Sequence, residues 1–309
     1  MCVWEEKRAT HTKKLAMDDD EAADLEVRRR LQSSGIFQLG APHEDVTLRL
    51  RVADGIGGGA ETGGRVWSAA LGLSAYLLSR CDACSTLPRW DCVMELGAGP
   101  GLPGLMLAAL GAAHRVCLTD AVPVTLQNLE HNRGNLPPAI AERVHVAHLD
   151  WRDLPGYKGS SLTPEWTDCG DIDLLLAADV VYEPTLAEPL LNTLVELLRR
   201  AKPGSVALLA AERRGGAAWP TFEALLRREA PGCGLRCVDR SADMKAALLT
   251  SSSFFCPRGS IERLTLLELS MPPKSRCQVV ARLHARTAKS ANANARTTNT
   301  VDLRIRVLG

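Results

Sequence analysis

Residues 92–104 read Cys-Val-Met-Glu-Leu-Gly-Ala-Gly-Pro-Gly-Leu-Pro-Gly and join a short apolar run to a glycine-rich loop. The apolar run, Cys92–Leu96, predicts a buried strand, and the residues that follow the loop predict the start of a helix. Glycines at such a junction let the backbone approach a ligand closely, and they leave the N–H groups of the helix N-terminus free to face it. The segment therefore predicts a strand, a ligand-binding loop and a helix in succession.

The glycines of this loop fit two nucleotide-binding patterns. Gly97, Gly99 and Gly101 form GxGxG, the loop of adenosylmethionine-dependent methyltransferases. Gly99, Gly101 and Gly104 form GxGxxG, the dinucleotide fingerprint. Neither string is specific by itself, so both interpretations stay open at this point. A phosphate-binding P-loop is excluded, because no Gly-Lys-Ser/Thr follows.

Apolar runs alternate with helical patterns along much of the chain. Strands are predicted at Cys92–Leu96, Val116–Leu118, Val144–Leu149, Ile172–Val181 and Val206–Ala211. Leucines at helical spacing between residues 186 and 198 predict the clearest helix. This alternation predicts βαβ units, and so an α/β fold with a parallel sheet and helices on both faces. Leu235–Val238 and Leu264–Leu269 lack a comparably strong helix between them and predict an antiparallel pair at the sheet edge.

Acidic side chains follow three of these strands, at the edge where open parallel sheets bind ligands. Asp120 can accept hydrogen bonds from ribose hydroxyls, or it can cap the next helix. Asp150 and Trp151 can contact an adenine, although a lone Trp is more often a core residue. The run 178–182, Ala-Asp-Val-Val-Tyr, places a carboxylate and a phenol beside the glycine loop. Because an unpaired carboxylate is costly to bury, we favour a role in the cleft over an exposed strand end.

Six blocks occur in a specific order between about residues 60 and 240. They are Glu61-Thr62-Gly63-Gly64-Arg65-Val66-Trp67, Glu95–Gly101, Leu118-Thr119-Asp120, Asn128-Leu129-x-x-Asn132, Leu149-Asp150-Trp151 and Ala178–Tyr182. In this order and spacing the chain resembles the seven-strand protein lysine methyltransferases of the family 16 type. The resemblance implies a Rossmann-like seven-strand methyltransferase fold, with a mostly parallel sheet, an antiparallel edge strand and helices on both faces. The dinucleotide interpretation predicts nothing about Trp67 or the Asp-Val-Val-Tyr run.

The same resemblance implies S-adenosyl-L-methionine as the cofactor, and no metal site is predicted. Its methionine end would lie against Trp67 and the glycine loop, its ribose against Asp120, and its adenine against Asp150 and Trp151. The full set of implied cofactor-binding residues is Trp67, Glu95, Gly97, Ala98, Gly99, Gly101, Asp120, Asp150, Trp151 and Ala178. Asp179 and Tyr182 match the family motif that faces the methyl-accepting amine, and they are the implied catalytic residues.

The function implied is methylation of a lysine side chain in a protein substrate. We hypothesise that Asp179 holds the incoming amine by a hydrogen bond and that Tyr182 orients it towards the methyl group. The alternatives within the class are arginine, histidine or a small amine as acceptor. More distant alternatives are a nucleotide-binding scaffold without activity and an NAD(P)-dependent oxidoreductase. The chain departs from the family pattern at Ser68, where many members have an acid, and in a polar insertion at residues 157–169.

Charge divides the chain into an acidic body and a basic tail. Of 37 basic and 36 acidic side chains, eight basic and one acidic lie in residues 272–309, which leaves 29 basic and 35 acidic residues in 1–271. We predict a charged, partly disordered leader at 1–44, a methyltransferase domain at 45–271 and a disordered basic tail at 272–309. The acidic body suits a basic protein surface. We expect nucleic acid to bind through the tail if anywhere, and we favour an idle tail.

No window approaches the ~18 consecutive apolar residues of a membrane span, and the N-terminus lacks the apolar core of a secretory signal. Most cysteines lie in apolar runs, as Cys92 and Cys117 do, which favours buried reduced thiols. These features predict a cytoplasmic monomer without membrane association, with the nucleus as a further location.

The substrate surface is expected at residues 46–66, 213–221 and 241–260. Residues 46–52 alternate apolar and basic side chains, which predicts an exposed strand. Phe254 and Phe255 either bind a partner or cover the core beneath a long loop, and these two interpretations carry equal weight.

Overall fold

The structure is a computed structural model in which residues 29–30, 32–40, 43, 45–52, 62–82, 90–153 and 172–272 are described. Most of the predicted leader, the polar insertion at 157–169 and the predicted tail from residue 273 lie outside the described residues. Within the described ranges, no helix combines the length and the apolar character that a bilayer span requires.

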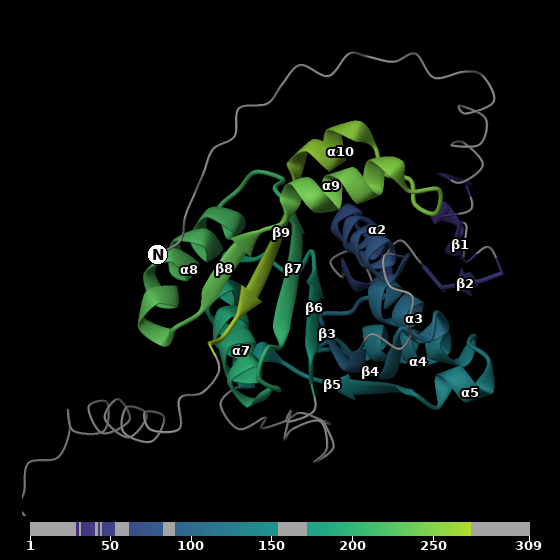
Figure 1. The fold of residues 1–309 in the computed structure, drawn as a ribbon, viewed down its shortest axis with the longest axis horizontal. Helices are drawn as coiled ribbons and strands as arrows, with labels where there is room; N and C mark the ends of the chain where they lie inside the picture. The colour runs from purple at the N-terminus through teal and green to yellow at the C-terminus, as the bar shows by residue number, and fades with distance from the viewer. Residues whose placement is uncertain are drawn as a thin grey trace, which may run out of the picture. The chain divides into compact units, whose positions relative to one another are not determined.

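A seven-stranded sheet forms the centre of the fold (Figure 1). Its strands are β3 (Trp90–Leu96), β4 (Ala113–Asp120), β5 (Val144–His148), β6 (Leu174–Ala178), β7 (Val206–Glu212), β8 (Arg236–Asp239) and β9 (Leu264–Ser270). In the order β5-β4-β3-β6-β7-β9-β8, the first five strands are parallel, and β9 is antiparallel to both of its neighbours. The mostly parallel seven-strand sheet and the antiparallel pair are confirmed. The antiparallel strand β9 lies one place in from the edge.

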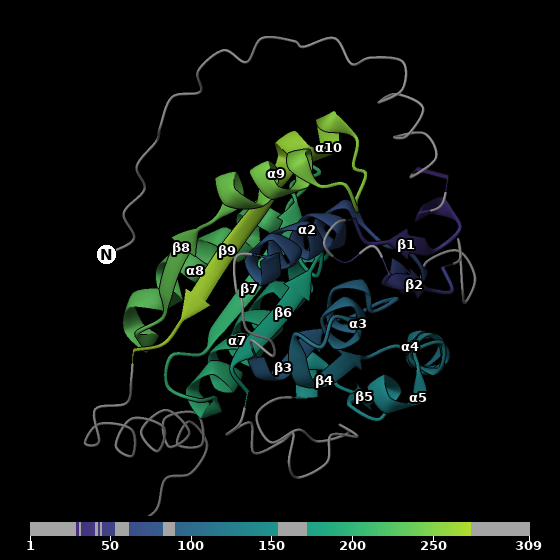
Figure 2. The same cartoon turned by 45° about the vertical axis from the view of Figure 1, so that its right-hand side comes forward.

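Helices cover both faces of this sheet, as predicted (Figures 1 and 2). They are α2 (Ser68–Asp82), α3 (Leu102–Ala109), α4 (Pro123–Gly134), α5 (Pro138–Ala141), α7 (Ala187–Arg200), α8 (Ala218–Cys233), α9 (Ser241–Thr250) and α10 (Arg258–Arg263). Successive residues of β3 alternate between two core clusters: Val93 packs with residues of α2 and α3, and Met94 with residues of α7 and α8. β3 therefore contributes side chains to a core on either side of the sheet.

Two helices between β8 and β9 were not expected from the sequence. In α9 only Met244 and Leu248 are buried, and in α10 only Ile261 is buried. By contrast, α7 buries Leu190, Leu191, Leu194, Leu197 and Leu198 along one stripe. A helix that buries so few side chains has little apolar periodicity in its sequence. For this reason the sequence predicted α7 but not α9 or α10.

The strand predicted at Ile172–Val181 is shorter than expected. β6 ends at Ala178, and Asp179 has a φ of 60°, which turns the chain out of the sheet. Asp is one of the few residues that adopt this left-handed backbone with modest strain. Asp179 and Tyr182 therefore lie in the loop after β6, next to the end of β3.

The N-terminal residues also differ from expectation. β1 (Ile36–Gln38) and β2 (Thr47–Arg49) form a separate antiparallel pair, with Phe37 opposite Leu48. Both side chains are 1% exposed, so the strand predicted as exposed is buried on one face, and the fold begins before the predicted boundary at residue 45. Phe254 packs against Phe37, with ring centroids 6.5 Å apart. For Phe254 the core interpretation is therefore the right one.

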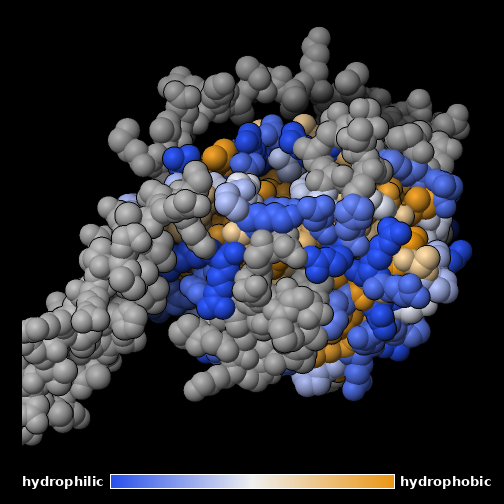
Figure 3. Space-filling model, turned by 60° about the horizontal axis from the view of Figure 1, so that its bottom comes forward, coloured by the Kyte–Doolittle hydropathy of each residue, from blue (hydrophilic) through white to orange (hydrophobic). Residues whose placement is uncertain are grey.

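Among the described residues, most large apolar side chains are buried. Figure 3 shows the side that faces downward in Figure 1, where hydrophilic residues cover most of the described surface and hydrophobic ones show between them. Among the described residues, the exposed large hydrophobic side chains are Tyr182, Val238 and Leu249. Of these, Tyr182 belongs to the predicted site.

Candidate functional site

A cavity of about 280 Å³ opens where β3, β4 and β6 end. The sheet grows from β3 towards β5 and then from β6 in the opposite direction, so this is the point at which open α/β sheets bind ligands. Every predicted site residue except Gly101 lines the cavity: Trp67, Glu95, Gly97, Ala98, Gly99, Asp120, Asp150, Trp151, Ala178, Asp179 and Tyr182. The fold thus gathers residues that are more than 100 positions apart in the sequence.

Gly97 lines the cavity at a point where there is no room for a side chain. Its φ is 58°, and a Cβ there would lie 2.8 Å from Cγ1 of Val180 and 3.2 Å from the ring of Trp151. Gly101 is not among the residues that line the cavity. It precedes α3, and a Cβ there would lie 2.9 Å from Cδ2 of Leu129, so Gly101 lets the loop pack on α4.

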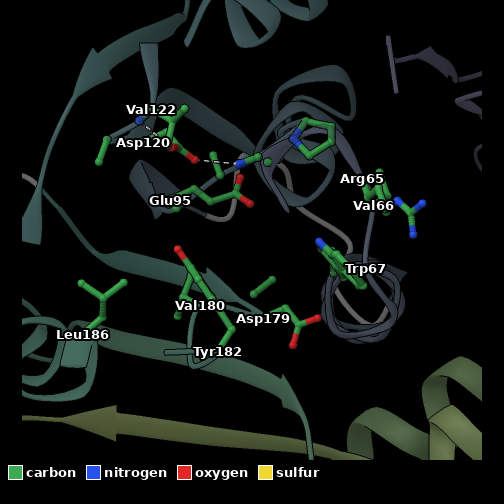
Figure 4. Close-up of a pocket in the computed structure, with 18 of the residues that line it drawn as sticks. Arg65, Val66, Trp67, Glu95, Asp120, Val122, Asp179, Val180, Tyr182 and Leu186 are labelled. Carbon is green, nitrogen blue, oxygen red and sulfur yellow. Dashed lines mark hydrogen bonds between the residues drawn. The ribbon is translucent and has the colours of Figure 1, made fainter. Parts of the chain in front are cut away.

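Asp120, the last residue of β4, holds the glycine loop in place. Its Oδ2 accepts a hydrogen bond from the Gly99 N–H at 3.2 Å, and its Oδ1 accepts one from the Val122 N–H at 3.0 Å (Figure 4). The N-cap of α4 is Val122, so Asp120 is not itself the helix cap. Burial raises the pKa of the Asp120 carboxyl, and the backbone N–H groups oppose that rise. A carboxylate in this position can still accept hydrogen bonds from a ligand, because each oxygen has a second lone pair.

Glu95, near the end of β3, is buried beneath the same loop. Its Oε2 accepts a hydrogen bond from the Gly104 N–H at 2.9 Å, which ties the strand to the first turn of α3. Burial raises the pKa of Glu95 from an ordinary value of 4.5 to about 8, and the nearby Asp120 carboxylate adds to the rise. The stability that this group contributes is therefore fully present below about pH 4.5 and is lost as the pH rises through about 8.

We expect Glu95→Gln to flatten the pH dependence of folding stability. Glutamine keeps an oxygen for the Gly104 N–H but has no proton to lose. Wild type should lose stability relative to the variant between about pH 5 and pH 8, by at most about 1.4 kcal/mol per pH unit. Urea unfolding of both proteins across this range measures the difference. Parallel curves would show that Glu95 titrates normally in the folded protein.

Asp150 and Trp151 follow β5 and form the far end of the cavity. The Asp150 carboxylate pairs with Arg152 at 2.5 Å, and this contact holds the pKa of Asp150 below its usual range. Trp151 lies in the 3-10 turn η2 (Trp151–Asp153), and its ring packs against Gly97. Within the described part of the chain, its indole N–H has no hydrogen-bond partner. An unsatisfied donor in a cavity wall is uncommon, and it fits a ligand that supplies an acceptor.

Asp179 is buried and already paired, contrary to the assumption that its carboxylate lacks a partner. Its Oδ1 accepts a hydrogen bond from the Glu212 N–H at 3.3 Å, and its Oδ2 accepts one from the guanidinium of Arg214. Burial raises the pKa of Asp179, and the adjacent Arg214 opposes that rise. Among the described residues, Asp179 is the only non-glycine with a positive φ. Such strain tends to concentrate at functional sites.

Tyr182 is 53% exposed and stands at the opening of the cavity. Burial of the phenol oxygen and the nearby Asp120 carboxylate raise the pKa of Tyr182, so the phenol stays protonated and can donate a hydrogen bond. In Figure 4 its hydroxyl points towards Glu95 and Asp120, whereas the Asp179 carboxylate points towards Trp67. The two motif residues therefore line one cavity but direct their polar groups to different sides of it.

A family model described as Lysine methyltransferase matches residues 47–227, more than half of the chain. The chain belongs to the lysine methyltransferase family. It is 39% identical over 150 residues to protein N-lysine methyltransferase METTL21A from Mus musculus, covering 48% of this chain and 60% of that protein. It is 30% identical over 213 residues to methyltransferase-like protein 22 from Homo sapiens, covering 66% of this chain and 48% of the relative.

A third relative is EEF1A lysine methyltransferase 3 from Mus musculus, 34% identical over 138 residues, covering 44% of this chain and 51% of that protein. The chain spans about half of the length of these relatives.

Asn128 and Asn132 of α4 hold the N-terminal segment and the glycine loop together. Asn132 donates from Nδ2 to the Pro100 carbonyl of the glycine loop at 3.0 Å, and its Oδ1 accepts from the Arg51 N–H at 2.6 Å. Asn128 accepts from Arg51 Nε at 2.7 Å and donates to the Arg51 carbonyl. The two asparagines thus connect the N-terminal strand pair, α4 and the cofactor loop.

Asn132→Leu should lower the free energy of unfolding by about 2–3 kcal/mol, because the buried Pro100 carbonyl and the part-buried Arg51 N–H lose their partner. Asn135→Leu serves as the control: Asn135 also donates to a carbonyl of the N-terminal segment, that of Arg49 at 2.9 Å, but it is exposed. Its loss should cost under about 0.5 kcal/mol. Denaturant unfolding of both variants tests the contrast. Equal losses would mean that the Asn132 contacts contribute nothing specific.

Sequence reasoning named neither Glu212 nor Arg214 as a site residue, although Arg214 lies in the 213–221 segment expected at the substrate surface. Glu212 ends β7, and Arg214 follows two positions later. Both contact Asp179, and the guanidinium of Arg214 also lies 4.6 Å from the ring centroid of Trp67. The sequence did contain a signal for these two residues. A charged run ends a fifth parallel strand, at the same sheet edge as the other site residues. The hydroxyl of Ser68, the residue that departs from the family pattern, helps to hold the pKa of Glu212 below its usual range.

Proposed function

We propose that this protein is an S-adenosylmethionine-dependent methyltransferase that methylates a lysine side chain of a protein substrate. The observation that carries the proposal is a single cavity that joins the glycine loop and Asp120 to Asp179 and Tyr182. Membership of the lysine methyltransferase family supports it, as does the similarity to METTL21A, which is named as a protein N-lysine methyltransferase.

The residues present fit the cofactor. Gly97 leaves room that a side chain would fill, Asp120 offers carboxylate oxygens for hydroxyl groups, and the Trp151 N–H is a donor without a partner among the described residues. Trp67 and Ala98 would face the methionine end, with Asp150 near the adenine. When bound, S-adenosylmethionine supplies a methyl group on a positively charged sulfur, which a neutral amine can attack.

The protein's task is to align a neutral amine and to keep water away from it. A free lysine has a pKa of about 10.4, so most of it arrives as an ammonium ion that cannot attack. Asp179 can accept a hydrogen bond from the N–H of the amine, because its oxygens retain lone pairs beyond those used by Glu212 and Arg214. This bond fixes the nitrogen while leaving its own lone pair free. The phenol of Tyr182, at the opening, can then position the methylene stem.

Two measurements test the proposal. Calorimetry should detect binding of S-adenosylmethionine and not of NAD, because the family is one of methyltransferases. Incubation with methyl-labelled S-adenosylmethionine and a cell lysate should then label protein, and acid hydrolysis should release the label as methyl-lysine. Label in methyl-arginine, methyl-histidine or a small amine would replace lysine as the acceptor. Binding of NAD alone would overturn the proposal.

Location and oligomeric state are part of the same proposal. The sequence supports a cytoplasmic monomer with the nucleus as a further location. Fluorescence imaging of the tagged chain and light scattering of the purified protein would check these two points.

A further inference from the structure

Four charged side chains form one cluster beside the acceptor end of the cavity. Arg214 contacts both Asp179 and Glu212, the latter at 2.9 Å. Arg263 contacts Glu212 at 2.6 Å, and its ion pairs within the described residues do not include Asp179. The carboxylates are buried, with side chains 4% and 3% exposed, whereas the arginines are 39% and 49% exposed. Two buried negative charges are thus covered by two positive charges at the rim.

Arg214 is the member of this cluster that touches the proposed reaction site. It contacts Asp179, which would hold the amine, and its guanidinium lies over Trp67, which would face the cofactor. Arg214 is not itself part of the cavity lining. Its position between two lining residues means that its charge acts on the site through them.

The cluster is close to electrically balanced. Burial opposes ionisation of Glu212, but hydrogen bonds from Arg263 and Ser260 and the charge of Arg214 hold the pKa of Glu212 below its usual range. The other polar groups that face Glu212 are the hydroxyl of Ser68 and the thiol of Cys256. Neither carries a positive charge. Without Arg214, the site would therefore present a net negative charge to whatever enters beside Asp179.

We propose that Arg214 is a positioning residue that neutralises the Asp179–Glu212 pair, so that the acceptor site does not favour an ammonium ion over a neutral amine. This inference rests on the proposed function. An uncompensated carboxylate pair would hold the acceptor lysine as an ammonium ion, which binds well and does not react. With Arg214 in place, Asp179 still accepts a hydrogen bond from the amine, while a nearby positive charge disfavours protonation of that amine.

The test compares two cofactor analogues, so it needs no knowledge of the protein substrate. Sinefungin carries an amine at the position of the transferable methyl group, and S-adenosylhomocysteine has nothing there. Calorimetry at about pH 8 gives the ratio of their dissociation constants, which measures how much the site favours a cationic amine. In Arg214→Gln we expect this preference for sinefungin to rise roughly fivefold or more, because a like charge a few ångströms away has been removed. A merely structural role would weaken the binding of both analogues and leave their ratio near that of wild type.

Two matched variants isolate the charge of Arg214. Arg214→Lys keeps the charge and should keep a preference close to that of wild type. Arg263→Gln removes an equal charge from the same Glu212 without touching Asp179, and it should change the preference less than twofold. Melting temperatures establish that each variant is folded. If wild type binds neither analogue, the proposed function fails and this inference fails with it. If both analogues bind but Arg214→Gln leaves the preference for sinefungin unchanged or lowered, only this inference fails. The inference also fails if Arg214→Lys changes the preference as much as Arg214→Gln does. It fails likewise if Arg263→Gln changes the preference by an equal amount.

Discussion

Asp179→Asn should abolish methyl transfer while S-adenosylmethionine still binds. The amide has nearly the shape of the carboxylate and keeps an oxygen for the Glu212 N–H, but it carries no charge for Arg214 and accepts more weakly from the incoming amine. Loss of a group that contacts the reacting atoms typically costs ~100-fold or more in rate. Transfer of labelled methyl groups to lysate protein measures the rate, and calorimetry measures cofactor affinity, which should change less than about threefold because Asp179 lies at the acceptor end.

Asp173→Asn is the matched control for this experiment. Asp173 directly precedes β6, at the end of the strand opposite Asp179, and pairs with Lys202 at 3.4 Å. The same chemical change there should leave methylation near the wild-type level. Full activity of Asp179→Asn would show that this carboxylate does not take part in the reaction. Loss of cofactor binding together with activity would move Asp179 from the acceptor end to the cofactor site.

Gly97→Ala should remove most cofactor binding, the second large effect. The new methyl group would lie 2.8 Å from Val180 and 3.2 Å from the Trp151 ring, on a backbone with a φ of 58° that alanine adopts only under strain. Relief requires the loop, Val180 or Trp151 to move, and each of them lines the cavity. We expect S-adenosylmethionine affinity to fall by roughly tenfold or more, equivalent to about 1.4 kcal/mol, as measured by calorimetry.

Gly111→Ala is the control that separates the effect of backbone strain from the effect of displacing neighbouring groups. Gly111 has a similar φ of 66°, but a Cβ there would meet nothing within 4 Å. Both variants should lose about 1–2 kcal/mol of folding stability through the left-handed backbone, and only Gly97→Ala should lose affinity. A comparable affinity loss at Gly111 would mean that general destabilisation accounts for the effect.

The sequence predicted the sheet and the loop well because both depend on local patterns. The β3 strand and the glycines after it are contiguous, and apolar runs of five to ten residues mark most other strands. The helices α9 and α10 escaped prediction because they bury few side chains. The end of β6 was misplaced because Val180 and Val181 continue the apolar run, while the turn depends on the backbone of Asp179.

Among the predicted site residues, the packing of Gly101 could not be read from the sequence for a similar reason. Its place in the GxGxG string is local information, but its neighbour Leu129 comes from α4 and appears only in the folded chain. Tyr182 lines the cavity together with the other predicted residues, and the direction of its hydroxyl depends on the loop that follows β6 (Figure 4).

By itself the sequence determined which residues can build a nucleotide site and the order in which strands deliver them, since both follow from spacing along one chain. Only the tertiary structure decided how the charges at that site are balanced. Asp179 follows β6, Glu212 ends β7 with Arg214 two positions later, and Arg263 ends α10. Their pairing depends on which strands lie side by side and on how deeply each carboxylate is buried, because burial makes an unpaired charge costly. That arrangement, in which Arg214 pairs with two buried carboxylates, cannot be read from the order of residues along the chain.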